Sequence, residues 1–182
     1  MRTPSLALTT LAVAACTLQT GCAIITAEPL WELTKAAAAV ANGAVALSPP
    51  TASNTLYKLR TPLDTVCIEF NNQTQVPDLV PALQAELHKH GIDSKVYDTP
   101  PAARLCNTWL EYTAYFEWGR PPFSGDFRPY VTSVQLALRS KEGELISSSQ
   151  FQLDPYLARG QWTSTRTKVS PVVTALVTGY QD

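Results

Sequence analysis

The sequence lacks the residue clusters on which most enzymes and metalloproteins depend. Its 182 residues include two histidines and four cysteines, and no Gly-x-Ser-x-Gly, P-loop or Gly-x-Gly-x-x-Gly motif occurs. His88 and His90 lie two apart on a predicted helix, so their side chains point about 200° from each other and cannot share a metal ion. We therefore expect no catalytic residue, no metal and no cofactor, and we predict that the chain is not an enzyme.

Clustered basic charge and long apolar runs are also missing. The formal net charge is -1 at pH 7, with 14 Lys and Arg residues against 15 Asp and Glu residues, and the basic residues form no block. Nucleic acids and anionic lipids both attract clustered positive charge, so the sequence argues against either as a partner. No apolar run reaches the roughly 20 residues that a membrane-spanning helix needs.

The N-terminus has the pattern of a secretory signal peptide. Arg2 provides a positive charge, and residues 6–18 form an apolar segment rich in Ala and Leu. This segment is too short to span a bilayer, and a polar step at residues 19–21 ends it. We therefore assign residues 1–21 to a signal peptide and exclude them from the fold.

The signal peptide ends directly before a cysteine, in the sequence LQTGC of residues 18–22. A small residue before a cysteine at this point resembles the lipobox of bacterial lipoproteins. The resemblance implies cleavage before Cys22, a diacylglycerol on its sulfur and an acyl chain such as palmitate on its amine. Gln19 stands where Leu, Val or Ile is usual, and residues 13–16 fit the pattern better, so Cys16 is the alternative anchor.

Cysteine parity favours Cys22 as the lipidated residue. If Cys22 is lipidated, Cys16 leaves with the signal peptide, and Cys67 and Cys106 remain as one pair in an oxidising compartment. If Cys16 is lipidated, Cys22 remains as an unpaired thiol. We predict a Cys67–Cys106 disulfide, which would remove roughly 3 to 4 kcal/mol of unfolded-chain entropy on the loop-closure model. Two buried reduced thiols are the alternative.

The mature chain is interpreted as a tether followed by one domain. Residues 22–53 form the tether, in which an alanine-rich run at residues 35–46 is a candidate helix and plain disorder is the alternative. Residues 54–182 have the length of a single domain. In the lipoproteins that the lipobox resembles, an Asp directly after the lipidated cysteine favours retention in the inner membrane, whereas here Ala23 follows the predicted anchor. We therefore expect the outer membrane, with the domain facing the periplasm.

The residue pattern of the domain predicts an α+β fold. Strands are expected where β-branched or alternating apolar residues occur, and amphipathic helices where apolar residues recur at helical spacing. Ser170 and Pro171 are expected to be the N-cap and first residue of the last helix. The β-α-β-β-β-β-α order predicts a mostly antiparallel sheet with both helices packed on one face. The expected strands span residues 65–70, 94–97, 108–118, 130–139 and 145–153, and the expected helices span residues 77–90 and 170–179.

Aromatic residues and arginines gather around a proline-rich loop at residues 119–129. Tyr, Trp and Arg dominate binding hot spots because they bury a large area with little loss of conformational entropy. We predict that this region binds a protein partner, and rings that cap the core are the alternative. The outer strand face with Trp109, Glu111, Thr113 and Tyr115 is a second candidate patch, and coverage of this face by the tether helix is the alternative. The predicted partner-binding residues are Tyr115, Trp118, Arg120, Phe123, Phe127, Arg128 and Tyr130.

Four segments of the mature chain carry a family resemblance: Val-Cys-Ile at residues 66–68, the helix end at His90-Gly91, Cys106 followed by LEYTA at residues 110–114, and Lys168 with Pro171. Together they resemble an uncharacterised family of proteobacterial lipoproteins, sometimes called Sbal-type, whose molecular function is unassigned. We interpret the chain as an outer-membrane-anchored periplasmic lipoprotein, an envelope interaction or assembly accessory with a protein partner. An immunity or inhibitor lipoprotein is the alternative, and a hydrolase is the least favoured reading.

We predict that the mature chain begins at an acylated Cys22. Mass spectrometry of the N-terminal peptide should find a diacylglycerol on this residue, because cysteine parity leaves Cys67 and Cys106 to pair with each other. An acylated peptide beginning at Cys16 would favour the alternative anchor. A soluble chain without any acyl mass would contradict the lipoprotein interpretation.

Overall fold

The computed structural model describes residues 34–180, apart from residues 36, 39, 42, 43, 46, 47, 75, 77, 100, 101, 103 and 104. The predicted signal peptide, Cys16 and Cys22 lie outside the described residues. The chain divides into two units, Met1–Ala38 and Ala39–Asp182, and every element named below belongs to the second. Within the predicted alanine-rich helix, the described residues between 35 and 45 are helical.

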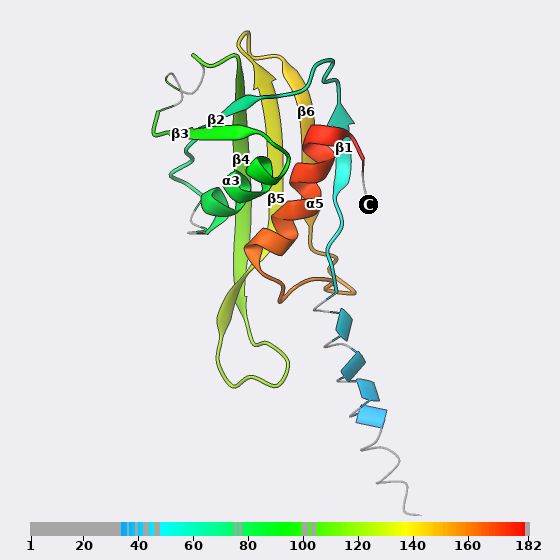
Figure 1. Ribbon diagram of the computed structural model, residues 1–182. Coiled ribbons are helices and arrows are strands. Elements are labelled where there is room, and N and C mark those ends of the chain that lie inside the picture. Colours follow the sequence, from blue (N-terminus) through cyan, green and yellow to red (C-terminus); the bar gives the residue numbers. More distant parts are fainter. Residues whose placement is uncertain are drawn as a thin grey trace, which may run out of the picture. The chain divides into compact units, whose positions relative to one another are not determined.

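The domain consists of a six-stranded sheet and two helices (Figure 1). The strand order is β1-β6-β5-β4-β2-β3, in which β2 pairs in parallel with β3 and β4, and the other neighbours are antiparallel. The predicted α+β class, with a mostly antiparallel sheet and two helices packed against it, is confirmed. The elements are β1 (Ser53–Tyr57), β2 (Thr65–Glu69), α3 (Leu79–Lys89), β3 (Asp93–Tyr97), β4 (Thr108–Gly119), β5 (Arg128–Ser140), β6 (Leu145–Gln152) and α5 (Thr165–Thr178).

Strand β1 is the one strand of the sheet that the sequence did not predict. It is an edge strand with mostly exposed side chains, so it shows no alternation of apolar and polar residues. Asn54 has a φ of 49°, and the register against β6 shifts between Ser53 and Leu56. The strand therefore exists because β6 offers it a hydrogen-bonding edge, and its own sequence gives little signal.

The core lies between one face of the sheet and the two helices. Leu79, Leu83 and Leu87 recur every four residues on α3 and are fully buried. Fully burying a side chain of this size stabilises the fold by about 1.5 to 3 kcal/mol. They pack in one cluster with buried residues of α5 and of the central strands, among them Val172, Leu176, Ile68, Leu110 and Leu138.

The start of α5 differs from its prediction. The N-cap is Ser164, whose hydroxyl accepts a hydrogen bond from the Thr167 amide at 3.1 Å, and Pro171 lies inside the helix. Prediction of Ser170 and Pro171 as the helix start is therefore wrong. The first turn of the helix is polar, so the apolar periodicity gave no sign of it, and the Ser170 hydroxyl bonds to Glu86 instead of capping a helix.

The predicted disulfide is confirmed between Cys67 and Cys106, whose Cα atoms lie 6.2 Å apart. Cys67 lies on β2, and Cys106 lies two residues before β4 begins. The parallel contact between these strands is short, with only the pairs Cys67–Trp109 and Ile68–Leu110 in register. The disulfide therefore reinforces the junction at which the parallel part of the sheet joins the antiparallel part.

Glu86 joins the two helices through a buried carboxylate. Its side chain is 3% exposed, and it accepts hydrogen bonds from Arg166 at 2.8 Å and from Ser170 at 2.7 Å, both on α5. The Lys89 ammonium lies 3.6 Å away on the next turn of α3. Burial by itself would raise the pKa of Glu86, but these hydrogen bonds and charges outweigh burial and lower the pKa below 4.5.

We expect Glu86→Ala to lower the free energy of unfolding by about 1 to 3 kcal/mol at pH 7, because it removes hydrogen bonds to a charged group at the helix interface. A pKa lowered in the folded state stabilises the fold above about pH 4.5, and this contribution disappears as the pH falls through the folded-state pKa. The difference between wild type and variant in urea unfolding should therefore shrink in acid. Glu144→Ala, at an exposed position, is the control, and an equal loss there would contradict the assignment.

Candidate functional site

Strands β4 and β5 extend beyond the rest of the sheet as a two-stranded ribbon (Figure 1). The two strands pair from Thr108–Ser140 to Gly119–Arg128, whereas the register of β6 against β5 ends at Ser133. A two-stranded ribbon is marginally stable by itself in water. We define the ribbon as residues 115–132, which include the connecting loop.

A β-bulge marks the point at which the ribbon leaves the sheet. The register shifts between Tyr115 and Phe116, so that Thr132 has no direct partner on β4. Its hydroxyl donates to the Tyr115 carbonyl at 3.2 Å, and its own carbonyl accepts from the Leu153 amide at 2.8 Å. Bulges bend a strand and increase its twist, so this one sets the direction of the ribbon.

Lys168 connects helix α5 to the base of the ribbon. It is 1% exposed, and its ammonium donates to the carbonyls of Val131 at 2.9 Å and of Gln161 at 2.8 Å. Burial lowers its pKa to about 8, although the Asp78 carboxylate acts in the opposite direction. The side chain thus ties α5 to β5 and to the loop before α5, at the level of the bulge.

Two aromatic rings hold the ribbon from the side. Tyr130 and Trp162 pack edge to face with centroids 4.9 Å apart, and the Tyr130 hydroxyl donates to Glu117 at 2.9 Å. Burial and the neighbouring Glu117 raise the pKa of Tyr130 above 10. A Cβ at Gly119 would lie 2.9 Å from the Tyr130 ring and 3.1 Å from Trp162, so glycine is required where the rings cross the ribbon.

A cleft of about 500 Å³ opens between the ribbon and the N-terminus of α5. Trp118 and Phe116 form its ribbon wall, and Ser164 and Thr165 form its helix wall. Among the described residues that line it, Asp78 is the only charged one. The full set of lining residues is Val76, Asp78, Phe116, Trp118, Pro129, Tyr130, Val131, Thr163, Ser164 and Thr165.

The predicted partner-binding residues all lie on the ribbon, and their exposure divides them. Phe123 is 84% exposed and Phe127 is 61% exposed, whereas Tyr130 is half-buried against Trp162. Tyr130 therefore fits the alternative in which the rings cap the core, whereas the two phenyl rings do not fit it. Tyr115, Trp118, Arg120 and Arg128 are exposed as well, and binding by these residues stays a prediction.

The residues that support the ribbon were not predicted as part of the site. Trp162 and Ser164 lie in the segment before α5, and Asp78 lies directly before α3. Lys168 entered the sequence interpretation only through the family resemblance. These residues are at least 30 positions from the ribbon in sequence, so no local spacing pattern connects them with it.

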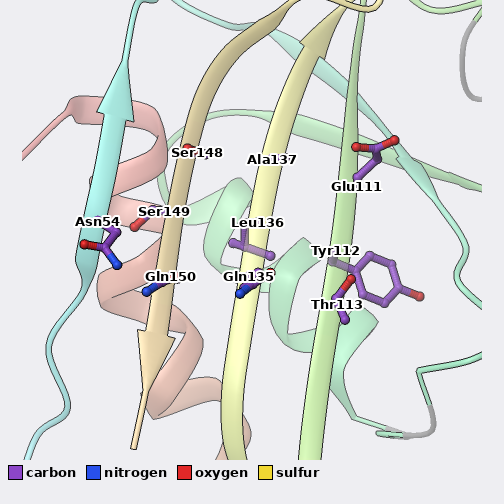
Figure 2. A pocket seen from close by; sticks show the side chains of 10 residues that line it. All are labelled: Asn54, Glu111, Tyr112, Thr113, Gln135, Leu136, Ala137, Ser148, Ser149 and Gln150. Atoms are coloured by element: carbon purple, nitrogen blue, oxygen red, sulfur yellow. The ribbon is translucent and has the colours of Figure 1, made fainter.

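The second candidate patch lies on the helix-free face of the sheet. Figure 2 shows a shallow hollow there, of about 310 Å³, with polar side chains such as Thr113, Gln135 and Gln150 around it. Glu111 at its rim is paired with Arg139 at 2.6 Å, and Trp109 is only 3% exposed. This is the solvated face that an antiparallel sheet with one covered side normally has.

The described part of the chain has neither a cluster of metal-ligating side chains nor a helix that could span a membrane. No group of three or more His, Cys, Asp or Glu residues there is arranged to hold a metal ion. The His90 ring lies 3.1 Å from the Thr174 hydroxyl, between α3 and α5. No helix among the described residues has the length and apolar character needed to cross a bilayer.

Comparison with known proteins finds the fold but no family. No family model matches the chain, and no curated protein matches its sequence. The chain is similar to a PelC variant dodecamer from Paraburkholderia phytofirmans, with 15% identity and a TM-score of 0.50 over 69% of this chain and 98% of that chain. A second PelC dodecamer structure from the same organism has 16% identity and a TM-score of 0.49 over the same shares. At these identities the likeness extends to the fold alone.

We expect stability to depend on pH through Lys168. Because its pKa is about 8 when folded and 10.5 otherwise, the unfolded chain binds more protons between these values, and stability rises with pH there by up to about 1 kcal/mol per unit. Urea unfolding of wild type and of Lys168→Met between pH 7.5 and about 9.5, below the titration of tyrosines, should show this rise only in wild type. Parallel curves for the two proteins would contradict the assignment.

Proposed function

We propose that the chain is an outer-membrane-anchored lipoprotein whose periplasmic domain is an interaction or assembly accessory of the cell envelope, without enzymatic activity of its own. The signal peptide pattern and Cys22 support the anchor. The disulfide between Cys67 and Cys106 supports an oxidising compartment such as the periplasm, because such bonds are rare in the cytosol.

The observation that carries the binding role is the aromatic cleft at the base of the ribbon. Trp118 forms one wall and is still 63% exposed, so most of its surface is open to a partner. Burial of such a ring in a pocket is the usual source of binding energy in a protein interface. Asp78 provides the only charge among the described lining residues, so the cleft suits a protein segment with an apolar side chain next to a basic one.

The solved structures with this fold give the assembly role some support. The PelC variant with a TM-score of 0.50 is described as a dodecamer, so a domain with this fold forms part of a multi-subunit assembly in at least one protein. Whether the partner of the cleft is a second copy or another envelope protein is decided by the experiment below.

We expect Trp118→Ala to weaken capture of the partner by about 1 to 3 kcal/mol, roughly 5- to 150-fold in affinity, and to leave the melting temperature nearly unchanged. The ring is largely exposed, so its removal leaves little cavity in the core. The measurement is crosslinking of the membrane-anchored full-length protein in cells, followed by affinity purification and identification of the captured chains.

Tyr180→Ala is a matched control, because Tyr180 is an aromatic residue that is 76% exposed and does not line the cleft. It should leave both capture and melting temperature unchanged. If Trp118→Ala lowers the melting temperature strongly without changing capture, the ring has a structural role and the proposed binding surface is wrong.

A further inference from the structure

The loop at the end of the ribbon holds two phenyl rings in solvent, outside the cleft. Phe123 and Phe127 do not line the cleft, and neither is named in the hydrophobic core cluster or among the residues packed against it. Phe123 has a φ of 63°, a left-handed conformation that is unusual for a bulky side chain. Such conformations cluster at binding and active sites, so together with its exposure this one indicates a role for the ring.

The residues around the two rings have the composition of a membrane interface. The Arg120 guanidinium lies over the Phe127 ring, 4.9 Å from its centroid, and Arg128 begins the returning strand. Phe, Trp and Leu side chains of interfacial segments bury at the boundary between lipid headgroups and acyl chains, and arginine extends its charged end to the headgroups. A protruding loop with apolar rings at its end and arginines beside them fits a bilayer surface better than it fits a concave pocket.

The chain enters the domain at the same end of the sheet. The Val45 carbonyl accepts from the Gly160 amide at 3.3 Å, Pro50 is buried, and β1 then begins at Ser53, which pairs with Gln150. Gln150 also pairs with Gln135 on β5, so Ser53 lies level with Gln135 in the sheet. Gln135 is seven residues from the start of β5 at Arg128. Figure 1 shows the start of β1 and the ribbon at one end of the sheet.

The length of the tether agrees with contact between the loop and the membrane. Seven residues of strand place the loop about 23 Å beyond the level of Ser53. About 23 residues separate Cys22 from Val45. As a flexible chain they span about 26 Å, and as a helix they span about 35 Å. In either conformation, an anchor at Cys22 allows the loop to reach the bilayer in which the acyl chains lie.

We infer that residues 120–128 insert the rings of Phe123 and Phe127 into the surface of the bilayer that holds the lipid anchor. This inference rests on the anchor of the proposed function and adds a second membrane contact to it. The loop carries two arginines against Asp126, so the contact depends on apolar burial and needs no anionic lipid. It fixes the orientation of the domain, with the helix-covered sheet extending away from the membrane.

The experiment uses the full-length mature protein, acylated in cells, verified by mass spectrometry and reconstituted in vesicles of phosphatidylethanolamine and phosphatidylcholine. Phe123→Trp places an indole at the loop, and Glu142→Trp places one in the exposed turn between β5 and β6, at the other end of the sheet. In vesicles with brominated acyl chains, we expect the emission that Phe123→Trp adds to wild type to fall to roughly half or less, as for a ring among acyl chains. The emission added by Glu142→Trp should not change.

The possible outcomes separate this inference from the proposed function. An acylated protein whose loop indole is not quenched, or is quenched no more than the indole at position 142, overturns the inference and leaves the lipoprotein intact. A blue shift without quenching by brominated lipid means that protein covers the loop, which also overturns it. A chain without acyl mass overturns the anchor and, with it, this inference.

Discussion

The whole domain depends on keeping two helices together over a single face of the sheet. The apolar residues of β2, β4, β5 and β6 that belong to the core cluster pack with α3 and α5, and the opposite face around Gln135 is polar and open. There is thus one core layer, and it is complete only when both helices are in place. Glu86 lies at their contact with its hydrogen-bond partners on α5, so separating the helices would leave a buried carboxylate without partners.

Because α3 and α5 cover only one face of the main part of the sheet, neither helix covers the ribbon. Helix α5 begins near the bulge, where Lys168 holds Val131 and Gln161, and neither α3 nor α5 lies over the strands beyond it (Figure 1). Lys168 therefore performs two tasks with one ammonium group. It satisfies carbonyls that would otherwise be buried without donors, and it fixes the direction in which the ribbon leaves the core.

Two surfaces with different chemistry result from this arrangement. The cleft is concave, has Trp118 on one wall and contains the charge of Asp78, whereas the loop is convex and ends in Phe123 and Phe127. A protein segment fits the first and a lipid surface fits the second. Under the two proposals, the bilayer would hold the cleft at a fixed height above the membrane, where an envelope partner meets it with fewer orientations to lose on binding.

The sequence by itself determined those features whose signals are local. The spacing of Leu79, Leu83 and Leu87 predicted α3, alternation predicted the long β4, and cysteine parity predicted the bridge between Cys67 and Cys106, because each of these patterns reflects one element or one chemical rule. The aromatic residues of the ribbon could also be found, since they cluster around one loop.

Only the tertiary structure decided what depends on partners distant in sequence. Strand β1 has no alternation of its own and forms on the free edge of β6. Helix α5 has its N-cap at Ser164, and its polar first turn packs against α3 through the hydrogen bond from Arg166 to Glu86. The cleft and the Lys168 support join residues from both sides of the core. A hydrophobic period records which face of an element is buried, but hydrogen bonds and ring contacts between elements leave no period in either sequence, so they are settled only when the chain packs.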